Sequence, residues 1–424
     1  MVNVTKRIVR LVIFSLSVSI IILLLINVDF QSINSDIVSI DDSNRSIIDK
    51  IKFNIKSKLS RDEIVEQNYS QLQKLLKQPI GEPKVKNLVP PPANPDEYER
   101  ANATLTVLVR NKELLKVIST IKQIESKFNN KYHYPYVFLN DEKFTDKFKE
   151  RILKVVSGEA YFETIDKKIW NQPSNIDKQK QHDSMNIMNA EGVGYAKMIS
   201  YHNMCRYYSM NFFNHPRMKQ FKYYWRFEPG THYYCDINYD VFKFMQSNNK
   251  KYGFTIALYD VEQSVRTLWP STLEFLEMNP HYLNENSAIK FLTENLQNPH
   301  KTEVANGYST CHFWSNFEIA DMDFYRDEAY TKWVEYLDSK GGFYYERWGD
   351  APVHSIGLSL FADKKDIHWF RDIGYKHDPY TLCSDCPNCK GCVPGDFTYK
   401  HLRDQNCLTN WWNLEMDDED RNLY

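Results

Sequence analysis

The sequence predicts an α/β domain built on a mixed, mostly parallel central sheet. From residue 103 onward, short apolar segments alternate with helical patterns in the order strand, helix, strand, helix, strand. Such alternation favours right-handed crossovers between parallel strands. The chain has 424 residues, of which 42% are hydrophobic and 14% aromatic, so it can build a large core. Its formal net charge of −2 gives no reason to expect a nucleic acid as partner.

An uncharged segment near the N-terminus, residues 11–28, predicts a membrane anchor. Its length of about 18 residues is close to the minimum that spans a bilayer. A cleaved signal peptide is the alternative, but it would have a shorter apolar region followed by small residues. Basic residues precede the segment and acidic residues follow it. The positive-inside rule therefore places residues 1–10 in the cytosol and the rest of the chain across the membrane.

Residues 29–99 are polar and end in a proline-rich stretch, residues 89–95. We expect a stem that holds a globular domain, residues 100–424, away from the membrane. The fragment from Pro95 onward should then be soluble and active without the anchor. Three N-x-S/T triplets on the same side of the membrane are candidate glycosylation sites; they begin at Asn44, Asn68 and Asn102.

Hydrophobic periodicity assigns the elements of the globular domain. Strands are expected at residues 103–109, 136–139, 160–163, 223–227 and 254–259. Helices are expected at residues 113–128, 144–156, 183–189, 198–213, 239–246 and 326–338. The chain has neither G-x-G-x-x-G nor G-x-x-x-x-G-K-S/T, so neither a dinucleotide-binding fold nor a P-loop is indicated.

A carboxylate stands at the carboxyl end of the strand expected at residues 223–227. Pro229 lacks a backbone N–H, so the ladder should stop at Glu228. Ligands of open α/β sheets bind at this edge, where a hard cation with a sugar-nucleotide diphosphate would want an oxygen ligand. The alternative is a surface glutamate before a turn. His377 is either a core histidine or the nitrogen ligand of the same metal.

Two further acids stand in unusual surroundings. Glu318 follows the aromatic-rich residues 312–317, and Asp350 lies in a predicted tight loop. Buried acids are rare unless they are paired or used. Two carboxylates in one cleft could serve as nucleophile and acid/base at a sugar carbon. The alternative for each acid is a structural ion pair, for example with Arg347 or Arg326.

Three other patterns are rejected as metal sites. The D-x-D motif at residues 321–323 directly precedes a helix, so we expect Asp323 to cap it. Residues 236–247 begin like an EF-hand loop but have Val and Ser where Gly and Glu are required. The four cysteines of residues 383–392 have zinc-like spacing. Because all eight cysteines lie beyond residue 200, on the non-cytosolic side, we expect disulfides instead, with no pairing assigned.

Six long strings resemble the fungal Golgi α-1,2-mannosyltransferases of glycosyltransferase family 15. They are YYWRFEPG from Tyr223, CDINYDVFKFM from Cys235, YGFTIALYD from Tyr252, CHFWSNFEIA from Cys311, GGFYYERWGDAPVHS from Gly341 and DIGYKHDPY from Asp372. The resemblance runs from Arg100 to Tyr380 and is specific because the strings are long. It implies a GT-A-like fold behind a signal anchor, with residues 100–424 as the catalytic domain.

The resemblance also implies an activity and its residues. The activity is a retaining transfer of mannose from GDP-mannose, with Mn²⁺, to mannose-terminated N- or O-linked glycans in the Golgi. Glu228, in an E-P-x motif, and His377 are implied as metal ligands. Glu318 is implied as the nucleophile, with Tyr201 and Asp350 beside the reacting centre. The candidates for donor binding are Arg226, Arg110 and Arg206.

Several alternatives stay open at this point. Retention needs either two displacements or one front-face exchange, and the sequence does not choose between them. A glycoside hydrolase using Glu318 and Asp350 would release sugar without nucleotide or Mn²⁺. A lectin-like member would have lost one of the implied catalytic or metal-binding residues, all of which are present. The choice between N-linked and O-linked acceptors is likewise open.

Overall fold

The computed structural model describes residues 59–424. The expected anchor at residues 11–28 and the triplet at Asn44 lie outside the described residues. Within the described range, no helix combines the length and the apolar character that a membrane span requires.

A central sheet of seven strands organises residues 59–424, in the order β10-β6-β9-β4-β1-β2-β3. Its strands are β1 (Ala103–Leu108), β2 (Tyr136–Asn140), β3 (Ala160–Thr164), β4 (Tyr223–Arg226), β6 (Tyr252–Phe254), β9 (Glu318–Asp321) and β10 (Ile367–Trp369). Strand β9 runs antiparallel to β4 and β6, and the other neighbours pair in parallel. The prediction of a mixed, mostly parallel sheet is confirmed.

Two smaller sheets adjoin the central one. They are formed by β5 (His232–Tyr233), β11 (Tyr375–His377) and β12 (Tyr380–Leu382), and by β7 (Ala257–Tyr259) and β8 (Cys311–Phe313). The single strand expected at residues 254–259 is therefore wrong. The chain leaves the central sheet after Phe254, because the carbonyl of Ile256 accepts a hydrogen bond from Trp314 N–H at 2.9 Å and β7 then pairs with β8.

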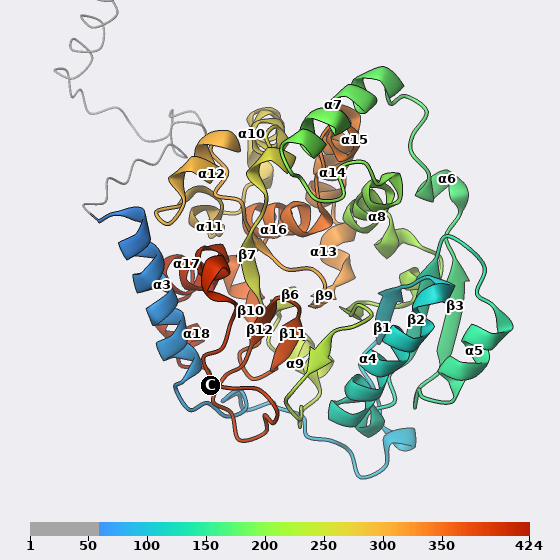
Figure 1. The fold of residues 1–424 in the computed structure, drawn as a ribbon. Coiled ribbons are helices and arrows are strands. Elements are labelled where there is room, and N and C mark those ends of the chain that lie inside the picture. Colours follow the sequence, from blue (N-terminus) through green and yellow to red (C-terminus); the bar gives the residue numbers. More distant parts are fainter. Residues whose placement is uncertain (1–58) are drawn as a thin grey trace, which may run out of the picture. The chain divides into compact units, whose positions relative to one another are not determined.

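Helices surround the sheet (Figure 1). They are α3 (Arg61–Leu76), α4 (Leu114–Lys127), α5 (Asp146–Leu153), α6 (Lys167–Trp170), α7 (Lys178–Ala190), α8 (Ile199–Met210), α9 (Val241–Ser247), α10 (Leu268–Met278), α11 (Ile289–Thr293), α12 (Pro299–Val304), α13 (Met322–Arg326), α14 (Glu328–Lys340), α15 (Gly342–Tyr345), α16 (Asp350–Phe361), α17 (Leu408–Leu414) and α18 (Asp418–Arg421). Helices α4 and α5 are the crossovers that connect β1 to β2 and β2 to β3. Ten of the twelve residues of α16 are buried, so this helix forms much of the core.

The cap before α13 differs from the expected one. Asp321, not Asp323, accepts a hydrogen bond from the first turn of α13, and Asp327 caps α14. Asp323 lies inside α13 and forms an ion pair with Lys222 at 2.7 Å. The helix expected at residues 326–338 is α14, which begins two residues later, and the short helix α13 precedes it with its own aspartate cap.

The described part of the expected stem is packed onto the globular domain. Helix α3 buries four apolar residues: Tyr69, Leu72, Leu75 and Leu76. It contacts α17, and Figure 1 shows it in blue beside the red C-terminal helices. Gln71 and Asn413 exchange two side-chain hydrogen bonds across this contact. Residues 59–99 therefore form one compact unit with the rest of the described chain.

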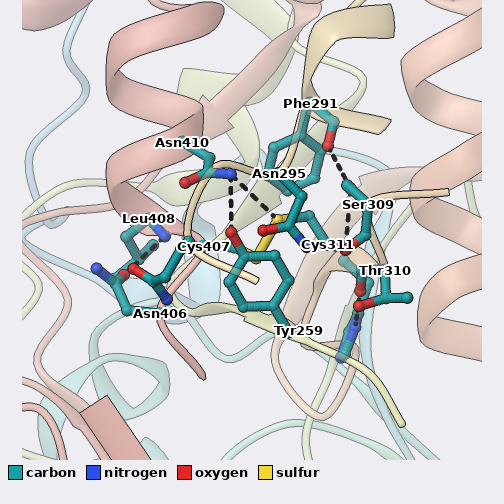
Figure 2. The surroundings of a disulfide bond; sticks show 12 residues. Tyr259, Phe291, Asn295, Ser309, Thr310, Cys311, Asn406, Cys407, Leu408 and Asn410 are labelled. Carbon is teal, nitrogen blue, oxygen red and sulfur yellow. Dashed lines mark hydrogen bonds between the residues drawn. A yellow bond between two sulfur atoms is a disulfide. The ribbon is translucent and has the colours of Figure 1, made fainter. Parts of the chain in front are cut away.

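Disulfides fix the C-terminal segment to the rest of the domain. Among residues 59–424 the bonds are Cys235–Cys389, Cys311–Cys407 and Cys383–Cys392, and Cys205 and Cys386 are free and buried. The expectation of disulfides is confirmed. Figure 2 shows Cys311–Cys407, which ties β8 to the start of α17. Beside it, Asn410 Nδ2 donates to Tyr259 Oη at 3.1 Å.

Candidate active site

A cavity of about 530 Å³ lies at the carboxyl edge of the central sheet. This is the edge where open α/β sheets bind their ligands. The ends of β1 and β2, one face of α8 and the turn after β4 contribute side chains to it, among them Arg110, Asn140, Asp141, Tyr201, Tyr208 and Glu228. A second cavity of about 550 Å³, between α6 and α7, has no carboxylate in its lining. The first cavity is therefore the candidate active site.

One buried guanidinium organises the acids of this site. Arg226, the last residue of β4, is 2% exposed, and its Cζ lies 3.5 Å from the centre of the Tyr208 ring. Its Nη1 lies 2.5 Å from Asp350 Oδ2 and 3.6 Å from Glu318 Oε1. Its Nη2 lies 2.8 Å from Glu228 Oε1. Arg226 therefore joins three predicted acids, while its own Nη atoms are taken by carboxylates.

The fold explains why these groups meet. Strands β4 and β9 are antiparallel neighbours, and their register places Arg226 directly opposite Glu318. Helix α16 begins at Asp350, whose Oδ2 also accepts a hydrogen bond from Ser315 Oγ at 2.8 Å. Glu228 follows β4 by two residues, as expected from the proline after it. The three acids thus come from three different elements that share one arginine.

The ion pair with Arg226 keeps Asp350 charged. Burial by itself raises the pKa of Asp350, but the Arg226 guanidinium, His354 and Ser315 outweigh it, so the pKa lies below its ordinary value. Burial likewise opposes the charge on Arg226, and the surrounding carboxylates reverse this and raise its pKa. Asp350 is therefore a carboxylate at neutral pH, and it is not poised to donate a proton.

Glu318 is fully buried and held by its second oxygen. Its Oε2 lies 3.1 Å from Tyr252 Oη and 3.1 Å from His354 Nδ1. The structural ion pairs suggested by the sequence, with Arg347 or Arg326, are not the ones observed. Arg347 contacts Asp260 at 3.3 Å. Arg326 donates to backbone carbonyls, including that of Phe213 at 2.8 Å.

Glu228 and His377 lie side by side at the open side of the site. The Nε2 of His377 is 3.9 Å from Oε2 of Glu228, and each side chain is about one-third exposed. Strand β11 brings His377 here because it pairs with β5, which follows Glu228 in the chain. The described residues contain no group of three or more His, Cys, Asp or Glu side chains arranged to hold a metal. A carboxylate and an imidazole thus fit a divalent cation as two ligands, with its other positions left to a bound ligand or water.

Two of the remaining candidates line the cavity and one does not. The Tyr201 ring stacks on Tyr195 at 4.7 Å, and burial raises the pKa of Tyr201 well above its usual value. Arg110 lies at the end of β1, paired with Glu113. Arg206 instead forms hydrogen bonds of 2.7 and 2.8 Å to Asp338 of α14. It holds α8 against α14 and is no longer a candidate for donor binding.

Sequence reasoning missed several polar residues of the site. Tyr252 and Ser315 carry no pattern that marks them before the sheet pairing is known. His354 stands four residues after Asp350, a spacing that places both on one face of α16, and this signal was available. Asn140 ends β2 beside the cavity, and its buried Nδ2 makes no hydrogen bond to any described residue.

Comparisons with known proteins identify the family of the chain. The family described as "Glycolipid 2-alpha-mannosyltransferase" matches residues 60–416. The "Probable mannosyltransferase KTR4" of Saccharomyces cerevisiae is 48% identical over 389 residues, which is 89% of this chain and 83% of that protein. The "O-glycoside alpha-1,2-mannosyltransferase omh1" of Schizosaccharomyces pombe is 44% identical over 279 residues, 66% of this chain and 70% of that protein.

Solved structures show the same relationship. The X-ray structure of the mannosyltransferase Ktr4p from Saccharomyces cerevisiae in complex with GDP has a TM-score of 0.86 and 47% identity, covering 89% of this chain and 98% of that one. Core-mannan synthase A from Aspergillus fumigatus, in its Mn/GDP form, has a TM-score of 0.78 and 46% identity, covering 81% and 94%. The chain therefore belongs to the glycolipid 2-alpha-mannosyltransferase family, glycosyltransferase family 15.

Proposed function

We propose that the protein is a GDP-mannose-dependent α-1,2-mannosyltransferase that acts with retention of configuration. The observation that carries the proposal is the cluster in which Arg226 joins Glu228, Glu318 and Asp350 beside the cavity at the sheet edge. Membership of the family supports it, because relatives are named α-1,2-mannosyltransferases. We propose further that the protein is a type II membrane protein of the Golgi and that residues 11–28 are its anchor.

The donor would occupy the cavity from the end of β1 to the turn after β4. Two relatives were solved with GDP, one of them in a Mn/GDP form. Arg110 and Asn140 stand at the strand ends, and Glu228 lines the same cavity. Glu228 and His377 would hold Mn²⁺, which when bound neutralises the charge that develops on the leaving diphosphate. The guanosine side would then face the strand ends and the diphosphate would face Glu228.

Glu318 would act at the anomeric carbon. It either attacks this carbon or stabilises its positive charge, and both routes need the carboxylate form. Arg226 holds Glu318 and Asp350 near each other. It forms no hydrogen bond with Oε1 of Glu318, so this oxygen keeps its lone pairs free. Asp350 would contribute its negative charge, in agreement with its lowered pKa. Tyr201, whose phenol is neutral at physiological pH and whose pKa is raised further by burial, would donate a hydrogen bond to a sugar hydroxyl.

The acceptor would be a mannose-terminated glycan on a glycoprotein. Relatives are named as acting on O-glycosides and glycolipids, and we extend only the mannose-terminated acceptor to this chain. N-linked and O-linked glycans both fit the proposal. The biological role would then be protein glycosylation and the synthesis of cell-wall mannoproteins.

One assay tests the proposal. Purified residues 59–424 are incubated with GDP-mannose and methyl α-mannoside, with Mn²⁺ or with EDTA, and the product linkage is determined by NMR. We expect an α-1,2-linked disaccharide that forms only with Mn²⁺. Release of mannose from a glycan without nucleotide or Mn²⁺ would support the hydrolase alternative instead. A folded protein that binds mannosides but turns over no donor would support the lectin alternative.

A further inference from the structure

We propose that His354 is the positioning residue of Glu318, and that it leaves Oε1 of Glu318, a buried oxygen beside Arg226, as the one free to react with the sugar. This inference deepens the proposed function and rests on it. It concerns a side chain on α16, one turn after Asp350, that does not line the cavity. The inference comes from the hydrogen bonds of two fully buried side chains.

The ring of His354 has one defined partner at each nitrogen. Its Nε2 lies 3.0 Å from the carbonyl oxygen of Tyr208, and its Nδ1 lies 3.1 Å from Glu318 Oε2. A carbonyl oxygen can only accept a hydrogen bond, so Nε2 must carry a proton. The contact at Nδ1 is then a hydrogen bond only if a second proton lies between Nδ1 and Oε2. The proposed mechanism needs Glu318 as a carboxylate, so this proton would belong to Nδ1, which would donate to Oε2 of Glu318.

The two carboxylate oxygens of Glu318 are therefore not equivalent. Oε2 has two partners, Tyr252 Oη and His354 Nδ1. Oε1 makes no hydrogen bond to any residue of the described range and lies 3.6 Å from Arg226 Nη1. An oxygen with free lone pairs is the one that can approach an electrophilic carbon. Because Tyr252 and His354 both bond to Oε2, Oε1 is the oxygen that stays free.

Arg226 makes this fixation necessary. Its Nη1 already lies within ion-pair distance of Oε1, and a small rotation of the carboxylate would bring the two to hydrogen-bond distance. Such a bond would compete with the sugar for the same lone pairs. The hydrogen bonds from His354 and Tyr252 hold the carboxylate against this rotation. Loss of the His354 bond should therefore slow the chemical step and leave the donor site intact.

Two substitutions of His354 distinguish the roles of its two ring nitrogens. The amide nitrogen of Asn takes the approximate place of Nδ1, and that of Gln takes the approximate place of Nε2. His354→Asn should retain a donor to Glu318 and lose the bond to the Tyr208 carbonyl. His354→Gln should retain the carbonyl bond and lose the donor to Glu318. Both remove a buried ring, so both should lower the melting temperature by similar amounts.

The test compares kcat, KM for GDP-mannose and GDP affinity in the two variants. A misplaced reacting group typically costs about 100-fold, so we expect His354→Gln to lose about 100-fold in kcat with nearly unchanged GDP affinity. The kcat of His354→Asn should be at least about tenfold higher than that of His354→Gln, because Asn restores a hydrogen-bond donor to Glu318. The control is His368→Gln. His368 is a buried histidine on β10 that forms a hydrogen bond with Tyr424, so its substitution should lower stability without lowering kcat per folded molecule.

The outcomes distinguish the inference from the function on which it rests. Equal kcat values in the Gln and Asn variants, or a loss that follows GDP affinity or folded fraction, would overturn the positioning role. If His354→Gln does not fold, Tyr252→Phe removes the other donor to Oε2 and should also lower kcat at constant GDP affinity. A wild-type protein that binds GDP but transfers no mannose would instead contradict the proposed function.

Discussion

The imidazole of His377 and the carboxylate of Glu228 lie 3.9 Å apart, Nε2 to Oε2. Glu228 follows the central strand β4, and His377 is the last residue of β11 in a separate small sheet. The E-P-x motif at Glu228 supplies one carboxylate, and His377 stands in no metal-binding pattern of its own. Their proximity is the reason why we propose Glu228 and His377 as two ligands of a divalent cation.

The first prediction is that Glu228→Gln and His377→Ala each weaken Mn²⁺ binding by at least about tenfold. GDP affinity should fall with it in Mn²⁺, and all three proteins should bind GDP equally weakly in EDTA. Isothermal titration measures both affinities. Glu113→Gln, which changes another acid of the cavity, should leave Mn²⁺ affinity unchanged. Wild-type GDP affinity that is undiminished in EDTA would contradict the metal assignment.

The second prediction concerns the start of the domain. The sequence suggested that a fragment from Pro95 would suffice, but α3 buries Leu72 and Leu76 against the domain. Each buried side chain of this kind contributes about 1.5–3 kcal/mol. A fragment of residues 95–424 should therefore have a free energy of unfolding several kcal/mol lower than that of residues 59–424, and should unfold at lower denaturant concentration. Leu72→Ala in the longer fragment should cost about 2–5 kcal/mol, whereas equal stability of the two fragments would show that α3 is dispensable.

The third prediction concerns the disulfides. Under denaturing, non-reducing conditions, residues 59–424 should show two reactive thiols, those of Cys205 and Cys386. The double variant Cys311→Ser/Cys407→Ser should lose roughly 2–5 kcal/mol of unfolding free energy, because it frees the C-terminal segment from β8. Thiol titration and chemical denaturation measure these quantities. Eight reactive thiols would contradict the bonded pairs.

The fourth prediction is a pH dependence of stability from Asp372. Burial raises its pKa from 3.8 to about 7, against hydrogen bonds from Tyr239 and Tyr424. The folded protein therefore holds a proton that the unfolded chain releases above about pH 4. The stability from this proton is fully present below about pH 4 and is lost as the pH rises through about 7.

Asp372→Asn should remove this dependence. The difference between the two pKa values corresponds to at most about 4 kcal/mol, so the variant's unfolding free energy should vary less than that of the wild type between pH 5 and about pH 7.5. Urea denaturation at several pH values is the measurement. Glu150→Gln, on an exposed face of α5, is the control. Parallel stability curves for Asp372→Asn and the wild type would contradict the prediction.

The sequence was informative wherever the signal is local. The first three strands and their crossover helices follow from apolar periodicity. Pro229 predicted that the strand would stop at Glu228, and β4 ends two residues earlier, at Arg226. Pairing across long sequence distances was not accessible. The partner of Glu318 is Arg226 because β9 lies antiparallel to β4, and no periodicity encodes that register.

The same limit explains the other errors. Helix α3 was expected to be part of a stem, because what covers its apolar residues is a helix more than three hundred positions later in the chain. The strand expected at residues 254–259 is divided between two sheets because β7 pairs with β8 rather than with β9. His354 is the exception, since its spacing from Asp350 on one helix was local information.

The fifth prediction addresses Glu318 itself. Glu318→Gln keeps the size of the side chain and removes its charge and most of its nucleophilicity. If Glu318 acts only at the transition state, kcat should fall while donor affinity barely changes. If it serves only as a buried ion-pair partner of Arg226, the melting temperature should fall and the rate should follow the folded fraction. Asp350→Asn provides the comparison, since it removes the other carboxylate on the same guanidinium.

The most direct measurement is therefore kcat for mannose transfer by Glu318→Gln, with the melting temperature and GDP affinity determined on the same sample. We expect kcat to fall by about 10³-fold or more, equivalent to roughly 4 kcal/mol of barrier, in a folded protein that binds GDP as the wild type does. A kcat close to that of the wild type in a well-folded Glu318→Gln protein would contradict the account and leave Asp350 as the leading candidate.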